Sequence, residues 1–350
     1  PDLFSLYEQW LHEDIPGPDG LGIKIGIPKS MYFYDRFPFF RSYFASLGAQ
    51  VVLSEHTTKK LAAHGRELCV AEPCFPIVVG HGHYLDLVEK QVDFIFMPQL
   101  INSETDTPQK ESWVCPWGQT LPLVIRNAIQ DEQQVDKLLM PVIHFRDGID
   151  YVKKELHGVA KRLGVSKRAS DRAVEFAYST QEQFRKRVRQ EGDRALKQLA
   201  EHRRQGVVIV GRPYNIYDGG VNLNVPNKLR ESYGVDVIPM DFLPLANIPV
   251  QQVHENMFWN YGRKILQAVT FAGQSKNLHV IYFTNFKCGP DSYIKHFVRD
   301  AIGAPYLTLQ FDDHSNDAGI MTRCEAYLES KGLLRGAPTP NLIENELNER

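Results

Sequence analysis

The sequence lacks several features that would assign it to a familiar class. No apolar run approaches the ~20 residues of a membrane-spanning helix, and no signal-peptide pattern opens the chain. Neither G-x-x-x-x-G-K-[ST] nor G-x-G-x-x-G occurs, so no recognisable nucleotide loop is present. The formal net charge is only −2, which gives no overall case for nucleic-acid binding. We therefore expect a cytoplasmic protein that binds neither membrane nor nucleic acid and does not itself hold ATP.

Cysteine is also scarce, with five residues in 350 and no C-x-x-C pair. A large chain with so few cysteines does not indicate a disulfide framework, and reduced thiols available for metal binding or catalysis are expected instead. The hydrophobic content of 43% and charged content of 23% are typical of a globular protein. The chain begins with Pro1 rather than Met, which indicates a piece of a longer polypeptide.

Short apolar segments alternate with helical patterns in two parts of the chain. Strands are predicted at 22–27, 50–53, 93–97, 207–210, 235–238, 280–283 and 306–309, and helices at 37–47, 57–68, 116–129, 225–232, 252–273, 291–302 and 319–331. Such alternation favours an α/β protein with two Rossmann-like, open parallel-sheet domains joined by a helical segment. The predicted divisions are a lead-in helix and linker at 1–21, domains at 22–147 and 206–335, a helical bridge at 148–205, and an exposed tail at 336–350.

The bridge is distinguished by one apolar stripe and by its charge. The stripe has helical spacing and consists of Ala173, Ala177, Phe184, Val188, Ala195 and Leu199. Between residues 151 and 205 there are 15 Lys or Arg against 7 Asp or Glu. This basic segment is either a docking face or an ordinary solvated helix surface.

Three cysteines lie where helices are expected to begin. Cys288 follows the strand at 280–283 and precedes a helix, a position where free N–H groups and the helix dipole favour an anion. Cys74 and Cys115 also precede predicted helices, and each of the three has a proline within two residues on its C-terminal side. A thiolate there is a good metal ligand or nucleophile, although a small packed cysteine fits the same pattern.

Loops beyond the carboxyl ends of parallel strands line the ligand site of open α/β folds. Cys74 and Cys115 from one domain could therefore meet Cys288 from the other. Three soft thiolates suit an iron–sulfur cluster, and also zinc. A zinc site formed by Cys74, His81 and His83 is an alternative, although it lacks a nearby fourth ligand.

A series of motifs carries a resemblance to a known superfamily. In chain order they are EPCFPI (72–77) with GHGH (80–83), CPWGQTLP (115–122), GRPYNIYD (211–218), PMDFLP (239–244), NMFWNYG (256–262), TNFKCGPDS (284–292) and DAGIMTR (317–323). This order closely resembles the activase-related members of the 2-hydroxyacyl-CoA dehydratase superfamily, which includes the double-cubane cluster proteins. The resemblance extends from about residue 22 to residue 334.

The resemblance implies an iron–sulfur redox protein with Cys74, Cys115 and Cys288 as cluster ligands. It implies one [4Fe–4S] cluster per chain, because a double cubane requires more thiolates than these three. It also implies an actin-like ATPase activase as partner, on upstream domains or as a separate dimer, and allows a homodimer. Cys69 and Cys324 fall outside the shared motifs and are interpreted as packed thiols.

The neighbouring polar residues have a functional and a structural interpretation. Candidates for ligation, proton donation or substrate contact are His81, His83, Arg212, Tyr214, Asn215 and Asp218. Packed histidines and a turn held together by Asn and Asp side chains are the structural alternatives. The leading functional hypothesis is the cluster-bearing electron acceptor of an ATP-driven reductase or dehydratase-like system. The alternatives are a non-catalytic electron-relay module and a zinc-binding or cluster-free scaffold.

Overall fold

The computed structural model describes residues 2–15, 17–18, 20–105, 110–246 and 248–334. Its first sheet has four parallel strands in the order β2-β1-β3-β5. The strands are β1 (Lys24–Ile27), β2 (Gln50–Leu53), β3 (Phe94–Phe96) and β5 (Leu138–Leu139). A separate parallel pair, β4 (Gln99–Asn102) and β6 (Val142–His144), extends the same half of the molecule.

The second sheet also has four parallel strands, in the order β10-β9-β7-β8. They are β7 (Gly206–Gly211), β8 (Asp236–Pro239), β9 (Leu278–Asn285) and β10 (Leu307–Phe311). Every residue of β7 is buried, because helices cover both faces of the sheet. Neither sheet closes into a barrel, which confirms the predicted α/β class with two open parallel sheets.

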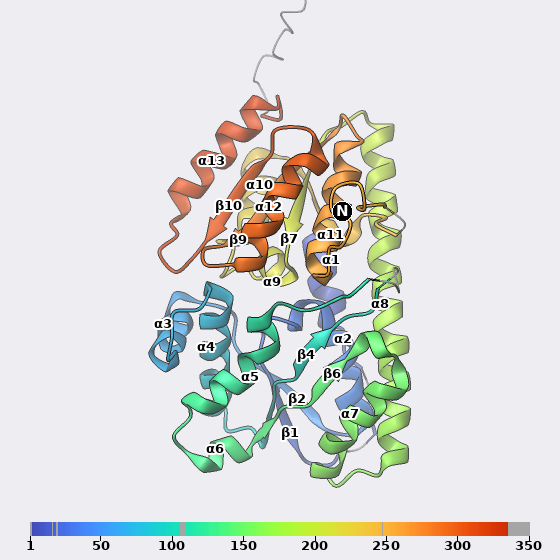
Figure 1. Cartoon of the computed structure of the whole chain (residues 1–350), viewed down its shortest axis with the longest axis vertical. Coiled ribbons are helices and arrows are strands. Elements are labelled where there is room, and N and C mark those ends of the chain that lie inside the picture. The colour runs from blue at the N-terminus through green and yellow to red at the C-terminus, as the bar shows by residue number, and fades with distance from the viewer. Residues whose placement is uncertain (1, 16, 19, 106–109, 247, 335–350) are drawn as a thin grey trace, which may run out of the picture.

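Helices of both halves surround these sheets (Figure 1). Those of the first half are α2 (Phe33–Ser46), α3 (Lys59–Leu68), α4 (Phe75–Glu89), α5 (Pro116–Ala128), α6 (Glu132–Asp136) and α7 (Ile149–Arg162), with the short 3₁₀ turn η1 (Phe145–Asp147). Those of the second half are α9 (Pro213–Tyr217), α10 (Val225–Tyr233), α11 (Asn260–Gly273), α12 (Gly289–Ile302) and α13 (Asp317–Ser330), with η2 (Met240–Phe242).

The long helix α8 (Lys167–Glu201) runs along one side of both halves (Figure 1). It starts at Ser166, whose side chain accepts a hydrogen bond from the Ala169 N–H. All six residues of the predicted apolar stripe are buried. This stripe packs against α2 and α7 in the first half and against η2 in the second, so one face of the helix contacts both halves.

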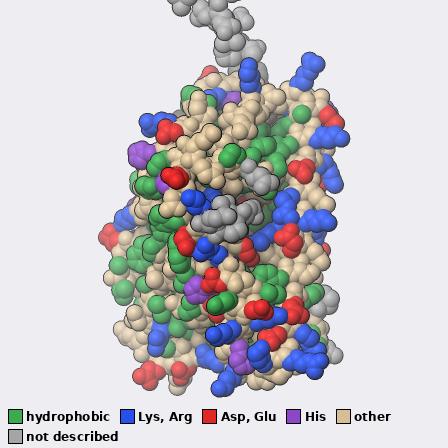
Figure 2. Space-filling view, turned by 45° about the vertical axis from the view of Figure 1, so that its right-hand side comes forward, with side chains coloured by type: hydrophobic (Ala, Val, Ile, Leu, Met, Phe, Trp, Pro, Cys, Tyr) green, Lys and Arg blue, Asp and Glu red, His purple; other side chains and the backbone are tan. Residues whose placement is uncertain are grey.

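The other face of α8 carries ion pairs with its own neighbours. Arg189 pairs with Glu182, Lys153 of α7 pairs with Glu175, and Lys167 pairs with Asp171. Figure 2 shows Lys and Arg side chains interspersed with Asp and Glu on this side of the molecule. The positive excess of the segment is therefore spread over a solvated surface.

Helix α2 begins four residues earlier than the predicted start at residue 37. Pro38 lies inside it and has no N–H to donate to the Tyr34 carbonyl one turn earlier. The Tyr7 hydroxyl of α1 (Leu3–Leu11) donates a 2.6 Å hydrogen bond to that carbonyl instead. The freed acceptor is thus satisfied from another helix, which local sequence could not indicate.

The predicted helix at 252–273 is wrong in its first part, since α11 begins only at Asn260. Trp259 is extended and bridges to Trp113 of the other half, so the chain there forms a strand-like link instead of a helix. Strands β4, β5 and β6, of two to four residues, were not predicted.

The predicted exposed tail at 336–350 lies outside the described residues. Within the described ranges, no helix combines the length and apolar character needed to cross a membrane.

Two helical glycines test the packing of α8. A Cβ added at Gly192 would lie 1.7 Å from the Phe242 carbonyl oxygen of η2, whereas one added at Gly158 of α7 would meet nothing within 4 Å. We expect Gly192→Ala to lower the free energy of unfolding by about 2 kcal/mol, because backbone must move. Gly158→Ala should raise it by up to ~1 kcal/mol through helix propensity. Urea denaturation of both variants measures this, and equal shifts would contradict the packing.

Candidate functional site

The three cysteines singled out in the sequence share one local geometry. Cys74, Cys115 and Cys288 are the N-cap residues of α4, α5 and α12, each with extended backbone and a proline in the first two helical positions. Proline is tolerated at these positions without the loss of a hydrogen bond, because the first N–H groups of a helix have no intrahelical partner. Each cysteine is 8% exposed.

The Cys115 sulfur accepts a 3.3 Å hydrogen bond from the N–H group of Gly118, three residues later. The N–H groups of Ile77 and Asp291 lie at the corresponding positions of α4 and α12, where neither cap sulfur accepts a hydrogen bond within the described residues. A sulfur in the cap position thus faces the positive end of a helix dipole. This environment favours a thiolate once a cation or cluster compensates its burial.

The three thiols lie close enough to influence one another. The pKa of Cys74 is raised to about 12, first by burial and next by the nearby Cys115 thiol. Burial raises the pKa of Cys288 as well, followed by the Asp291 carboxylate, with a smaller contribution from Cys74. Helices from both halves therefore present their N-cap sulfurs to one neighbourhood, which we call the three-cysteine site.

A buried ion pair lies beside this site. Arg212 follows β7, and its Nε donates a 2.9 Å hydrogen bond to Asp291 Oδ1 of α12. Asp291 Oδ2 accepts a 2.7 Å hydrogen bond from Thr284 of β9. Strands β7 and β9 are adjacent, but the chain continues from β7 to β8 at one edge of the sheet and from β9 to β10 at the other edge. Open α/β folds bind ligands at such a switch in strand order. Arg212 lowers the pKa of both Cys74 and Cys288.

Tyr214 and Asn215 of α9 are also buried at this end of β7. Burial raises the pKa of Tyr214 well above its usual value, and all three cysteines contribute in the same direction. Asn215 has no exposed surface, and neither its Oδ1 nor its Nδ2 has a hydrogen-bond partner among the described residues. Since buried amides are normally paired, Asn215 indicates a place where another group binds.

His83 belongs to a different set of contacts, which joins the two halves. Its Nδ1 lies 2.8 Å from Ser54 Oγ, and its Nε2 lies 3.0 Å from Thr57 Oγ1. Thr57 donates a 2.6 Å hydrogen bond to Asp218 Oδ2 of the second half. Thr57 must therefore accept from the Nε2–H of His83, and burial, which lowers the pKa of this side chain to about 3, keeps the ring neutral. Both ring nitrogens thus take part in hydrogen bonds at the contact between the halves.

Asp218 also holds its own turn. Its Oδ1 accepts hydrogen bonds from the N–H groups of Gly220 and Val221, at 2.9 and 3.2 Å. Burial raises its pKa, against the lowering effect of the hydrogen bond from Thr57. Asp218 therefore stabilises a turn, as the structural alternative proposed, whereas Arg212 and Tyr214 lie beside the three-cysteine site.

His81 lies two turns beyond Cys74 on α4 and is fully buried. Its Nδ1 contacts the Ile77 carbonyl at 2.8 Å, so this nitrogen carries the proton. Its Nε2 has no partner among the described residues. Nor do any three His, Cys, Asp or Glu side chains within those residues form a site for a single metal ion. These contacts give no support to a zinc site from Cys74, His81 and His83.

The remaining cysteines lie elsewhere. Cys324 of α13 is fully buried in the core, and burial raises its pKa to about 12. Cys69 ends α3 and is half-buried. Both serve as matched controls for the three-cysteine site.

The donor set suits a [4Fe–4S] cluster better than a single ion. Each cysteine of such a cluster binds a different iron, so its sulfurs lie farther apart than the ligands of one ion. A Cβ added at Gly289, next to Cys288, would meet nothing within 4 Å, which leaves open space at the start of α12. The buried Arg212 supplies positive charge beside the thiols. These residues fit the cluster.

Sequence reasoning missed Asp291 and Thr57 as parts of these networks. Asp291 belongs to the motif at 284–292 and is the third helical residue after Cys288, where the helix dipole favours a carboxylate. This position could have indicated its role. No sequence pattern could have indicated the role of Thr57, because its partners His83 and Asp218 come from two distant segments.

The fold and the site define an α/β protein with cysteines from two open-sheet halves gathered at helix N-termini. A family model described as CoA enzyme activase uncharacterised domain (DUF2229) matches residues 24–243, more than half of the chain, and the chain belongs to this family. The matched segment includes Cys74, Cys115 and Arg212 and ends before Cys288. No curated protein matches the chain.

The buried His83 predicts a pH dependence of stability. Burial, followed by the charges of Lys29, His56 and Lys90, lowers its pKa to about 3. The unfolded chain takes up this proton near pH 6.5 and the folded chain does not, so stability is present above that pH and is lost as the pH falls. We expect His83→Gln to flatten the fall in unfolding free energy between pH 6.5 and 4 by up to ~1.4 kcal/mol per pH unit.

Urea denaturation at several pH values measures these slopes. The matched control is His314→Gln, because the His314 side chain is 86% exposed and should leave the slope unchanged. A wild-type slope in His83→Gln would show that His83 is not the neutral, buried group described above.

Proposed function

We propose that the chain is the cluster-bearing electron acceptor of an ATP-driven, low-potential electron-transfer system. The observation that carries this proposal is the gathering of three N-cap cysteines from both halves around Arg212. Membership of a family associated with activases of CoA enzymes supports the same context. When bound, a [4Fe–4S] cluster supplies one-electron chemistry at a potential set by charge, hydrogen bonding and exposure.

Residues of this chain would set those three quantities. The N–H group of Gly118 donates to the Cys115 sulfur, and hydrogen bonds to sulfur tune the potential of a cluster. The buried Arg212 offsets negative charge at the thiolates. Three cysteines leave one iron without a thiolate, and the unpaired Asn215 amide is a candidate for a polar group near it.

An electron-relay module is the second candidate function. Each ligand cysteine is only 8% exposed, and electrons cross a buried site more readily than a substrate molecule does. In that case the chain passes electrons to a separate dehydratase-like protein. Binding of a 2-hydroxyacyl-CoA with a change in the cluster's EPR signal distinguishes an enzyme from a relay.

Cysteine replacement tests the ligand assignment. After anaerobic reconstitution, we expect Cys288→Ala, Cys74→Ala and Cys115→Ala each to lose most of the bound iron and sulfide, because the cluster loses an anchoring thiolate. Iron and sulfide analysis with EPR provides the measurement.

Cys324→Ala and Cys69→Ala are the matched controls, and their iron content should equal that of the wild type. Full iron content in Cys288→Ala would remove the second half of the protein from the site and refute the assignment.

Energy coupling provides a further test. No nucleotide loop is recognisable in the sequence, so we expect the chain alone to bind ATP without useful affinity. Adding an activase of the actin-like ATPase type with ATP and reductant should reduce the cluster further than reductant alone. Spectroscopic titration measures the reduced fraction. Equal reduction with and without ATP, at one activase concentration, would refute the coupling.

A further inference from the structure

A second site lies where α2, the chain after β4, α8 and α11 meet. It is a cavity of about 260 Å³, which we call the α8–α11 cavity. The residues that carry the argument are Arg36, Glu104, Arg185, Arg189, Asn260 and Lys264. None of the three cysteines is among its described lining residues, so this site is separate from the three-cysteine site.

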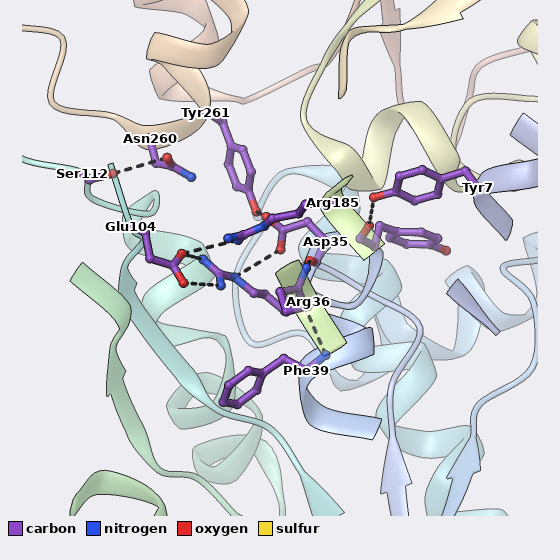
Figure 3. Close-up of polar contacts among 11 residues, drawn as sticks. Tyr7, Asp35, Arg36, Phe39, Glu104, Ser112, Arg185, Asn260 and Tyr261 are labelled. Carbon is purple, nitrogen blue, oxygen red and sulfur yellow. Dashed lines mark hydrogen bonds and ion pairs between the residues drawn. The ribbon is translucent and has the colours of Figure 1, made fainter. Parts of the chain in front are cut away.

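The cavity has an excess of positive charge. Its described lining holds five cationic side chains and two carboxylates. Arg36 binds Glu104 through two hydrogen bonds, and Arg189 pairs with Glu182 at 2.6 Å, so both carboxylates already have a cation. Arg185 Nη2 reaches the same Glu104 carboxylate only at 3.4 Å (Figure 3). Its charge is therefore weakly compensated.

Lys264 of α11 adds a further positive charge, which interacts with a carboxylate without forming an ion pair: burial raises the pKa of Asp241, and Lys264 lowers it. Its Nζ has no hydrogen-bond acceptor or ion-pair partner within the described ranges, and lies 5.8 Å from the centre of the Tyr261 ring. The hydroxyl of Tyr261 donates a 3.0 Å hydrogen bond to Asp35 of the first half, which fixes the ring at the edge of this region (Figure 3). An ammonium group held in this way is available to an anion.

Asn260 is the independent observation that points to a ligand. It is 3% exposed and is the first residue of α11, where the helix dipole is positive. Its Oδ1 accepts a 3.3 Å hydrogen bond from Ser112, while its Nδ2 has no partner among the described residues. Figure 3 shows the amide nitrogen on the side turned away from Ser112, toward Glu104 and Arg185. Buried N–H donors are normally paired with an acceptor, so this unpaired donor indicates that a ligand supplies one.

We propose that the α8–α11 cavity binds the phosphoryl group of a small phosphorylated molecule. A guanidinium, an ammonium and a neutral amide donor converge there from two helices, which suits a tetrahedral dianion with several acceptor oxygens. An adjoining cavity of about 190 Å³ shares Arg185, Arg189 and Lys264 and offers room for the remainder of the molecule. Its lining combines the buried apolar side chains of Phe184 and Val188 with the carboxylates of Asp35 and Asp241.

The position of the cavity gives the ligand a structural effect. Arg185 belongs to α8, Asn260 and Lys264 belong to α11 of the second half, and Glu104 belongs to the first half. A bound phosphoryl group would attach the second half to the long helix beside the Arg36–Glu104 pair. Binding should therefore stabilise the assembled fold, since a ligand bound only by the native state raises its stability.

Calorimetric titration of the full chain with pyrophosphate, at constant ionic strength, tests the proposal, with inorganic phosphate as the smaller probe. We expect saturable binding that weakens about tenfold or more in Lys264→Gln, because a charged hydrogen bond is lost. Asn260→Asp should weaken it further, since it places a carboxylate where the amide donor lies. Lys276→Gln, at an exposed lysine of the same half, should bind like the wild type.

Thermal unfolding gives a second readout that remains valid if Asn260→Asp folds poorly. Pyrophosphate should raise the melting temperature of the wild type and of Lys276→Gln, and raise that of Lys264→Gln much less. Absence of saturable binding in the wild type overturns the proposal. Equal affinity in Lys264→Gln and the wild type also overturns it, because the ligand then binds elsewhere. Neither result bears on the cluster, whose test is iron content.

Discussion

The buried ion pair between Arg212 and Asp291 is the interaction on which the second half of the site depends. It joins the end of β7 to the start of α12, and Thr284 ties the same carboxylate to β9. Both charged side chains are almost completely buried. Removing one partner would leave an uncompensated charge in the interior, which typically costs several kcal/mol. The position of Cys288, three residues before Asp291, follows from this constraint.

The contacts between the halves have two different chemical characters. Near the cysteines His83, Thr57 and Asp218 form a chain of hydrogen bonds with one direction of donation, and Lys287 pairs with Glu72. Beside α8 they are charged, with Arg36, Glu104 and Arg185 close to Asn260 and Lys264 of the other half. The hydrogen-bonded chain fixes the relative position of the halves with its polar atoms paired. The region beside α8 retains unpaired donors, which is why it, and not the hydrogen-bonded chain, carries a ligand-binding proposal.

Local patterns in the sequence were sufficient for much of the architecture. The four strands of the second sheet, which contain apolar runs, and the helical stripe on α8 were both predicted. Cysteine followed by proline at a helix start was equally informative, because capping depends on neighbouring residues only. The failures occurred where a distant segment supplies a partner. Tyr7 allows Pro38 to lie inside α2, and Trp113 holds Trp259 extended before α11.

The sequence by itself therefore determined the fold class, the helix N-termini that carry Cys74, Cys115 and Cys288, and the candidate residues around them. Only the tertiary structure decided how those candidates divide: Arg212 and Tyr214 beside the thiols, His83 and Asp218 in the contact between halves. It also revealed Asn260 and Lys264, which no motif had assigned a role. The physical reason is that capping and periodicity are local properties, whereas hydrogen-bond pairing depends on which distant segments folding brings together.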